Sequence, residues 1–77
     1  MIKVEFTIEP FEMGEAPERV TRAVAAIEAM GISVEIGAFG SAFTTDSAQA
    51  GPAISALLAA AYAHGATHVT IGTEAVK

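Results

Sequence analysis

The stretch ISVEIGAFGSAFTT, residues 32–45, holds two strand-like segments that follow each other across a short glycine-containing turn. In residues 32–39 apolar and polar side chains alternate, which is typical of a strand with one covered and one open face. The alternating residues are Ile32, Ser33, Val34, Glu35 and Ile36. The second segment, residues 41–45, reads SAFTT. The centre of the chain therefore predicts two consecutive strands joined through the GAFG turn.

A strand and a helix are predicted on the N-terminal side of this hairpin. Residues 1–10, MIKVEFTIEP, alternate strictly between apolar and polar, and Pro10 ends the pattern. Between Pro17 and Gly31 apolar residues recur at helical spacing. Proline suits the first position of a helix and glycine suits its end, so we predict a helix between these two residues.

A second helix and a last strand are predicted on the C-terminal side. We expect this helix to begin at Pro52 and to end at Gly65. Its predicted buried stripe consists of Ile54, Leu57, Leu58, Ala61 and Tyr62. Residues 68–76, HVTIGTEAV, alternate again and predict the final strand.

The predicted order of elements is strand, helix, strand, strand, helix, strand. Two β-α-β halves of this kind form the ferredoxin-like α+β fold, a four-stranded antiparallel sheet with both helices on one face. Seventy-seven residues suffice for one such domain, so residues 1–77 are predicted to form a single ferredoxin-like domain.

Composition narrows the possible partners. The formal net charge is −5, from nine acidic and four basic residues, whereas phosphate binding needs clustered Lys and Arg, so we expect no nucleic-acid partner. The N-terminal residues lack the pattern of a signal peptide, and the longest apolar run, ISALLAAAYA, is too short to span a bilayer. There is no cysteine. We expect a cytoplasmic protein with no membrane partner.

One long segment carries no charge. From Ser47 to Thr73 there is no Asp, Glu, Lys or Arg, although the outer face of a surface helix normally carries charged residues. Small uncharged residues on an outer face indicate a covered face, most simply a subunit contact. Alternatively, the outer face is uncharged only because this sequence is rich in alanine, and no subunit covers it. We expect a homo-oligomer, a dimer or a tetramer.

No catalytic, metal or cofactor site is predicted. His64 and His68 have a metal-ligand spacing, but Gly65 interrupts the helix between them, and no cysteine supports a metal site. The serines lack a nucleophile-elbow motif. The open face of the predicted sheet carries Glu5, Thr7, Glu9, Glu35, His68 and Thr70. Two alternatives stay open: a small enzyme of the dimeric αβ-barrel kind, which would use His68, and a structural assembly module.

Three segments carry a resemblance: FTIEP at 6–10, GAFGSAFTTD at 37–46 and GATHVTIGT at 65–73. Together they resemble the thiamine-binding proteins of the YkoF-like type, over nearly the whole chain in element order. One departure is the Glu12-Met13-Gly14 segment, where the family has Gly-Thr-Gly and only Gly14 matches. The resemblance implies a non-catalytic protein that binds thiamine or its hydroxymethylpyrimidine half in vitamin uptake, salvage or sensing. It also implies the assembly of several repeats.

The predicted ligand-binding residues follow from this resemblance and from their chemistry. Glycine lets a flat ring approach the backbone, phenylalanine offers a stacking surface, hydroxyl groups fix orientation, and carboxylates attract the positive thiazolium ring. The predicted residues are Thr7, Glu9, Phe11, Glu35, Phe39, Ser41, Thr44 and Thr45.

Overall fold

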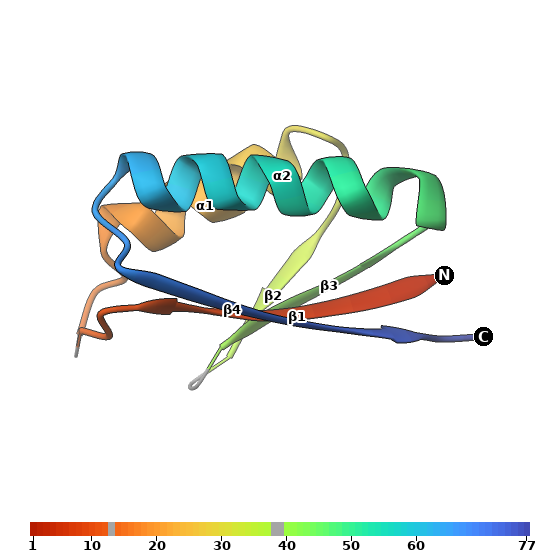
Figure 1. Ribbon diagram of the computed structural model, residues 1–77. Coiled ribbons are helices and arrows are strands. Elements are labelled where there is room, and N and C mark those ends of the chain that lie inside the picture. Colours follow the sequence, from red (N-terminus) through yellow and green to blue (C-terminus); the bar gives the residue numbers. More distant parts are fainter. Residues whose placement is uncertain (13, 38–39) are drawn as a thin grey trace.

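A computed structural model describes residues 1–12, 14–37 and 40–77. Four strands and two helices follow in the predicted order. The elements are β1 (Ile2–Glu9), α1 (Glu18–Glu28), β2 (Val34–Ile36), β3 (Ser41–Thr45), α2 (Ser47–Ala63) and β4 (His68–Ala75). Figure 1 shows both helices on one face of the sheet, which confirms the predicted ferredoxin-like α+β class.

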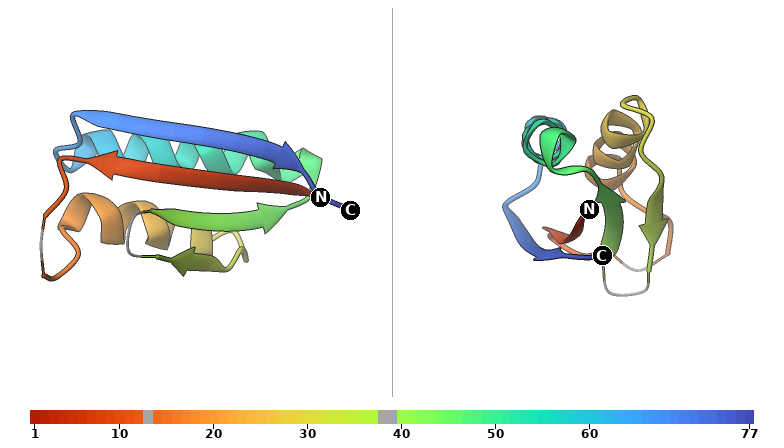
Figure 2. Two further views of the ribbon diagram at one scale, coloured as in Figure 1. Left: turned by 90° about the horizontal axis from the view of Figure 1, so that it is seen from below. Right: turned by 90° about the vertical axis from the view of Figure 1, so that its right-hand side faces the viewer.

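The sheet has the order β2-β3-β1-β4, and every neighbouring pair is antiparallel. Figure 2 shows its open face from below, with β1 and β3 in the middle and β2 and β4 at the two edges. β1 is paired along its length with β4, from Ile2 opposite Ala75 to Glu9 opposite His68. The position of every side chain on β3 and β4 is thus set by the alternation of β1.

The core lies between the sheet and the two helices. Val4, Phe6 and Ile8 of β1 are all at most 4% exposed, as the strict alternation predicts. They pack with residues of both helices and of the neighbouring strands. The remaining core residues are Ala23, Ile27, Ile32, Phe43, Ala53, Leu57 and Ala61.

α2 begins five residues earlier than the sequence prediction. Asp46 is its N-cap, because its Oδ1 accepts a hydrogen bond of 2.8 Å from the Gln49 N–H. Pro52 therefore lies inside the helix, where its ring nitrogen cannot donate to the preceding turn. The cap, not the proline, sets the start of this helix.

Two further details differ from the sequence predictions. Tyr62 was expected in the buried stripe of α2 but is 51% exposed, because Ala53, Leu57 and Ala61 form the face that contacts the core. β2 is limited to Val34–Ile36, whereas a strand was expected over 32–39. Residues 38 and 39 of that expectation lie outside the described residues.

α1 lies between Pro17 and Gly31 as expected, but it ends at Glu28, and residues 29–31 form a turn. Pro17 is the N-cap immediately before the helix. Gly31 has a φ of +81°, a left-handed conformation that favours glycine, and its N–H donates to the Glu28 carbonyl at 2.9 Å. In the described residues, no helix is long and apolar enough to cross a membrane.

The Asp46 cap gives a testable prediction about stability. Replacing Asp46 with alanine removes the acceptor for the Gln49 N–H and should lower the free energy of unfolding by about 1 kcal/mol. Chemical denaturation followed by circular dichroism measures this change. Asp46→Asn retains an acceptor and should stay close to the wild type; an equal loss in both variants would contradict the capping role.

Candidate functional site

The open face of the sheet is polar and mostly exposed. Its residues are those that alternate with the core positions, and the register places them side by side across the strands. They are Lys3, Glu5, Thr7 and Glu9 on β1, Glu35 on β2, Ala42 and Thr44 on β3, and His68, Thr70, Gly72 and Glu74 on β4.

One row of four residues crosses the whole sheet. Glu35 lies opposite Ala42, Ala42 opposite Glu5, and Glu5 opposite Gly72. Carboxylates thus alternate with two of the smallest residues. With neighbouring strands about 4.8 Å apart, the Glu5 and Glu35 backbones are about 10 Å apart, with only the Ala42 methyl group between them.

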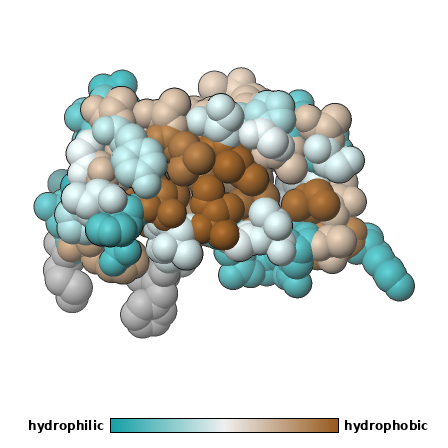
Figure 3. Space-filling view, viewed as in Figure 1, coloured by the Kyte–Doolittle hydropathy of each residue, from teal (hydrophilic) through white to brown (hydrophobic). Residues whose placement is uncertain are grey.

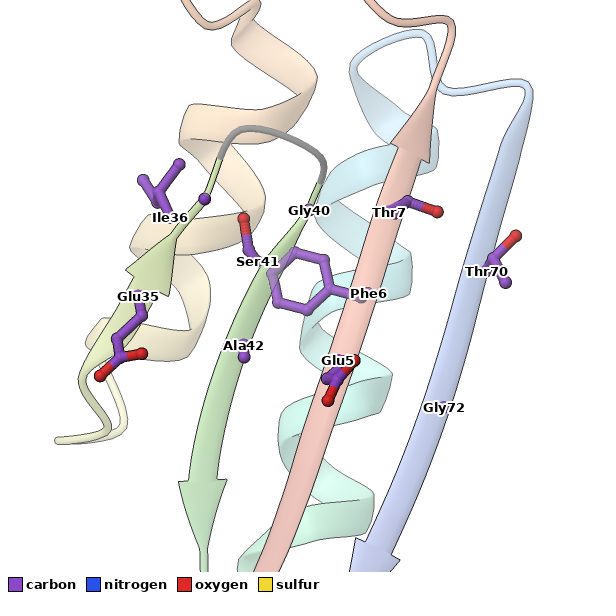
Figure 4. A pocket seen from close by; sticks show the side chains of 11 residues that line it. Glu5, Phe6, Thr7, Glu35, Ile36, Gly40, Ser41, Ala42, Thr70 and Gly72 are labelled. Carbon is purple, nitrogen blue, oxygen red and sulfur yellow. The ribbon is translucent and has the colours of Figure 1, made fainter.

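A hollow of about 560 Å³ lies over this row and extends toward the β2–β3 hairpin. Figure 4 shows Glu5, Glu35 and Thr7 around it, with Ala42 and Gly72 adding no bulk to its floor. Thr70 adds a further hydroxyl group to its lining, whereas Ser41 borders the hollow but lies opposite the buried Phe6, so its side chain points toward the helices. Its walls therefore offer carboxylates and hydroxyls around an apolar floor.

Gly40 brings the end of the hairpin close to β1. A Cβ atom at this position would lie 3.1 Å from the Phe6 carbonyl oxygen and 3.1 Å from Cγ2 of Thr7. The Gly37 N–H donates to the Gly40 carbonyl at 2.7 Å. The close approach needs a residue without a side chain, which accounts for one of the glycines in the central motif.

The two carboxylates of the hollow have different surroundings. Nζ of Lys3 lies 3.4 Å from Oε1 of Glu5, and both side chains are well exposed. In the described part of the chain, no basic side chain lies within 4.0 Å of the Glu35 carboxylate. Glu35 is thus an exposed negative charge with no ion-pair partner at the rim of the hollow.

The structure brings three of the predicted ligand residues together. Thr7, Glu35 and Ser41 line the hollow. Thr44 is on the same open face but belongs to a second hollow of about 500 Å³ toward Lys3 and Asp46. Glu9 lies at the far end of β1, opposite His68 and outside the hollow.

The other three predicted ligand residues lie elsewhere. Phe11 is 65% exposed in the loop after β1 and borders a separate hollow of about 280 Å³ beside α1. Phe39 lies outside the described residues. Thr45 is 6% exposed on the helix-facing side, where its hydroxyl bonds to Oε1 of Gln49 at 3.2 Å, so it does not reach the open face.

Sequence reasoning did not include the small residues of the floor or the second carboxylate in the ligand set. Glu5 and Thr70 were expected on the open face, but the importance of Ala42 and Gly72 depends on which residues lie opposite Glu5. That register is a tertiary property. Strand alternation was a usable signal for Thr44 and Thr45, since two consecutive residues of a strand point to opposite faces.

Neither histidine lines the hollow. Nδ1 of His64 lies 3.3 Å from Oε1 of Glu18, which joins the end of α2 to the start of α1. His68 is exposed on β4, with Nδ1 3.1 Å from the Thr67 hydroxyl. Among the described residues, no group of three His, Cys, Asp or Glu side chains could hold a metal ion.

Comparisons with known proteins support the fold. The sequence matches no protein-family model and no curated protein. The domain of unknown function DUF77 from Bacillus cereus has a similar structure, with a TM-score of 0.67, 16% identity, and coverage of 95% of this chain and 71% of that chain. The hypothetical protein MJ1052 of Methanocaldococcus is also similar, with a TM-score of 0.62, 19% identity, and coverage of 95% and 75%. At such identities the likeness shows a shared fold.

The glycines provide a prediction about packing. Gly40→Ala places a methyl group 3.1 Å from the Phe6 carbonyl and should lower the free energy of unfolding by about 1 kcal/mol. Gly51→Ala is the matched control, because its Cβ meets nothing within 4 Å and alanine favours a helix. It should raise the free energy of unfolding by up to about 1 kcal/mol. Equal effects in urea denaturation would contradict the close approach at Gly40.

Proposed function

We propose that this protein is a non-catalytic binder of a flat heteroaromatic molecule, either thiamine, whose thiazolium ring is positively charged, or its hydroxymethylpyrimidine half. The observation that carries the proposal is the Glu35–Ala42–Glu5–Gly72 row beneath an open hollow of about 560 Å³. Its volume falls within the range typical of small-molecule sites, about 300–1,000 Å³.

The shape of the floor suits a planar ring. Ala42 projects only a methyl group between the two carboxylates, and a Cβ added at Gly72 would meet nothing within 4 Å. A ring can therefore lie against the sheet without displacing a large side chain. The hydroxyls of Thr7 and Thr70 lie beside this floor as hydrogen-bond donors and acceptors for ring nitrogens and an amino group.

The charge of the lining favours a cation. Glu5 and Glu35 flank the floor, and the formal charge of the chain is −5. Carboxylates accept hydrogen bonds from an aminopyrimidine and attract a thiazolium ring. Because both groups are exposed, the attraction is screened by salt, and binding should weaken as ionic strength rises.

A binding role without turnover fits the hydroxyl groups of the lining. An activated nucleophile needs a base within hydrogen-bond reach. Among the described residues, no hydrogen bond joins the hydroxyl of Thr7, Ser41 or Thr70 to a carboxylate or a histidine. The resemblance of FTIEP and GAFGSAFTTD to YkoF-like thiamine-binding proteins supports the same role, because these segments carry Thr7 and Ser41.

Calorimetric titration with thiamine and with hydroxymethylpyrimidine tests the proposal. Glu5→Gln and Glu35→Gln should each weaken thiamine binding by about two- to five-fold, since an exposed charge contributes at most about 1 kcal/mol. Glu28→Gln, an exposed change on α1, is the control and should leave the affinity unchanged. If neither thiamine nor hydroxymethylpyrimidine released or absorbed heat at millimolar concentration, the proposal would be contradicted.

A pair of leucine substitutions locates the ligand on the sheet. Ala42→Leu fills the floor of the hollow between the carboxylates and should reduce affinity at least about ten-fold, because the ring loses its contact surface. Thr44→Leu is the matched control on the same face of β3 and lies outside this hollow. If only Thr44→Leu weakened thiamine binding in the same titration, the site would have been assigned to the wrong hollow.

A further inference from the structure

β4 is a long edge strand with an unpaired outer edge. It spans eight residues, and in the described part of the chain it pairs only with β1. The Val76 N–H donates to the Met1 carbonyl at 3.0 Å, and antiparallel bonding alternates along a strand. The even-numbered residues of β4 therefore bond to β1, and the N–H and C=O groups of Val69, Ile71 and Thr73 point outward.

This edge lacks the features that usually prevent strand pairing. Charged side chains, prolines, bulges or a very short strand protect most exposed edges. The opposite edge, β2, has only three residues and carries Glu35 at its centre. β4 has no charged Asp, Glu, Lys or Arg and no proline from His68 to Thr73. The two edges are thus different, and only β4 is suited to pair with another strand.

An apolar surface lies directly above this edge. Figure 3 shows apolar side chains gathered between α2 and β4. Val69 and Ile71 are only partly buried on the helix-facing side of β4, and Ile54 and Leu58 are partly buried on α2. Tyr62 follows at the same four-residue spacing and is 51% exposed. An occupant of the edge would cover this surface as well.

We propose that the occupant is a second copy of this chain, whose β4 pairs antiparallel with β4 to form a continuous eight-stranded sheet. The two copies are related by a twofold axis perpendicular to the sheet at Ile71, which keeps all four helices on one side. Strand pairing alone buries less than the roughly 800 Å² per partner of a standard interface. The apolar residues of α2 supply the additional area.

Alternation and charge select the register. Opposite residues of an antiparallel pair point to the same face, so helix-facing residues must lie opposite helix-facing residues. A twofold axis at Ile71 and one at Gly72 both meet this condition, and both pair the same number of β4 residues. Only the axis at Ile71 places the two Ile71 side chains together and His68 opposite the partner's Glu74.

The same register orders the charges on the open face. Lys3 lies opposite Glu74, and Glu9 lies opposite His68. Across the interface the row becomes Lys3, Glu74, the partner's His68 and the partner's Glu9, so basic and acidic groups alternate. In the alternative dimer, two copies would pack with their open sheet faces against each other. That arrangement would bring together the acidic groups of Glu5, Glu9 and Glu35, which repel one another.

The pairing also extends the hollow over Glu5. Gly72 ends the floor at the edge of one chain. In this register the partner's Thr70 lies directly opposite Gly72 and adds a hydroxyl to that side. The dimer itself does not depend on the proposed ligand and is tested without it.

Disulfide cross-linking of single-cysteine variants tests the register, because the chain has no native cysteine. With the axis at Ile71, the Cα atoms of Ile71→Cys lie about 5.5 Å apart, a distance that a disulfide spans. Ile71→Cys should form covalent dimers rapidly under mild oxidation. Thr73→Cys, about 13 Å from its copy, is the control and should not. Faster cross-linking at Gly72→Cys or Thr73→Cys would overturn the register.

Substitution of exposed His68 tests the interface without altering the core. His68→Lys strengthens and His68→Glu weakens the contact with the partner's Glu74. Because each dimer has two such pairs, the dimer dissociation constant should fall in the first variant and rise in the second, each by roughly two- to thirty-fold. Sedimentation equilibrium measures both constants. A monomeric wild-type protein, or equal effects of the two variants, would overturn the proposal.

Discussion

The structure depends on the alternation of side chains along β1, one of the two central strands of the sheet. Val4, Phe6 and Ile8 face the helices and are buried, so Glu5 and Thr7 must face away from them. The ladders to β3 and β4 then bring Ala42 and Gly72 beside Glu5. A slip of one residue would expose the core and remove the acid-and-small-residue row at once.

Much of the fold could be predicted from the sequence because alternation and helical spacing are local. The strand at MIKVEFTIEP and the glycine turn that follows α1 at Gly31 are of this kind. The predicted start of α2 was wrong because Pro52 is a strong local signal for the first position of a helix. In the structure the Asp46 side chain accepts a hydrogen bond from the Gln49 N–H, and this cap starts the helix before the proline. The exposure of Tyr62 depends on how α2 rotates onto the sheet, which spacing alone does not fix.

The candidate site was less predictable because it depends on register. The family resemblance and side-chain chemistry selected Thr7, Glu35 and Ser41, which the structure places along one hollow. They also selected Thr45, whose hydroxyl is used inside the protein by Gln49. Ala42 and Gly72 have no reactive group and gain their role only from their neighbours across the strands. The small residues of such a site are therefore the hardest to predict from a single sequence.

The position of the two chain ends has a consequence for connectivity. The Val76 N–H bonds to the Met1 carbonyl at 3.0 Å, so both ends meet at one end of the β1–β4 pair (Figure 1). A short linker between them would close the backbone into a ring without disturbing the ladder. The chain could then be reopened at an exposed connection such as the one near Gly31, giving a circular permutant in which β1 is an internal element.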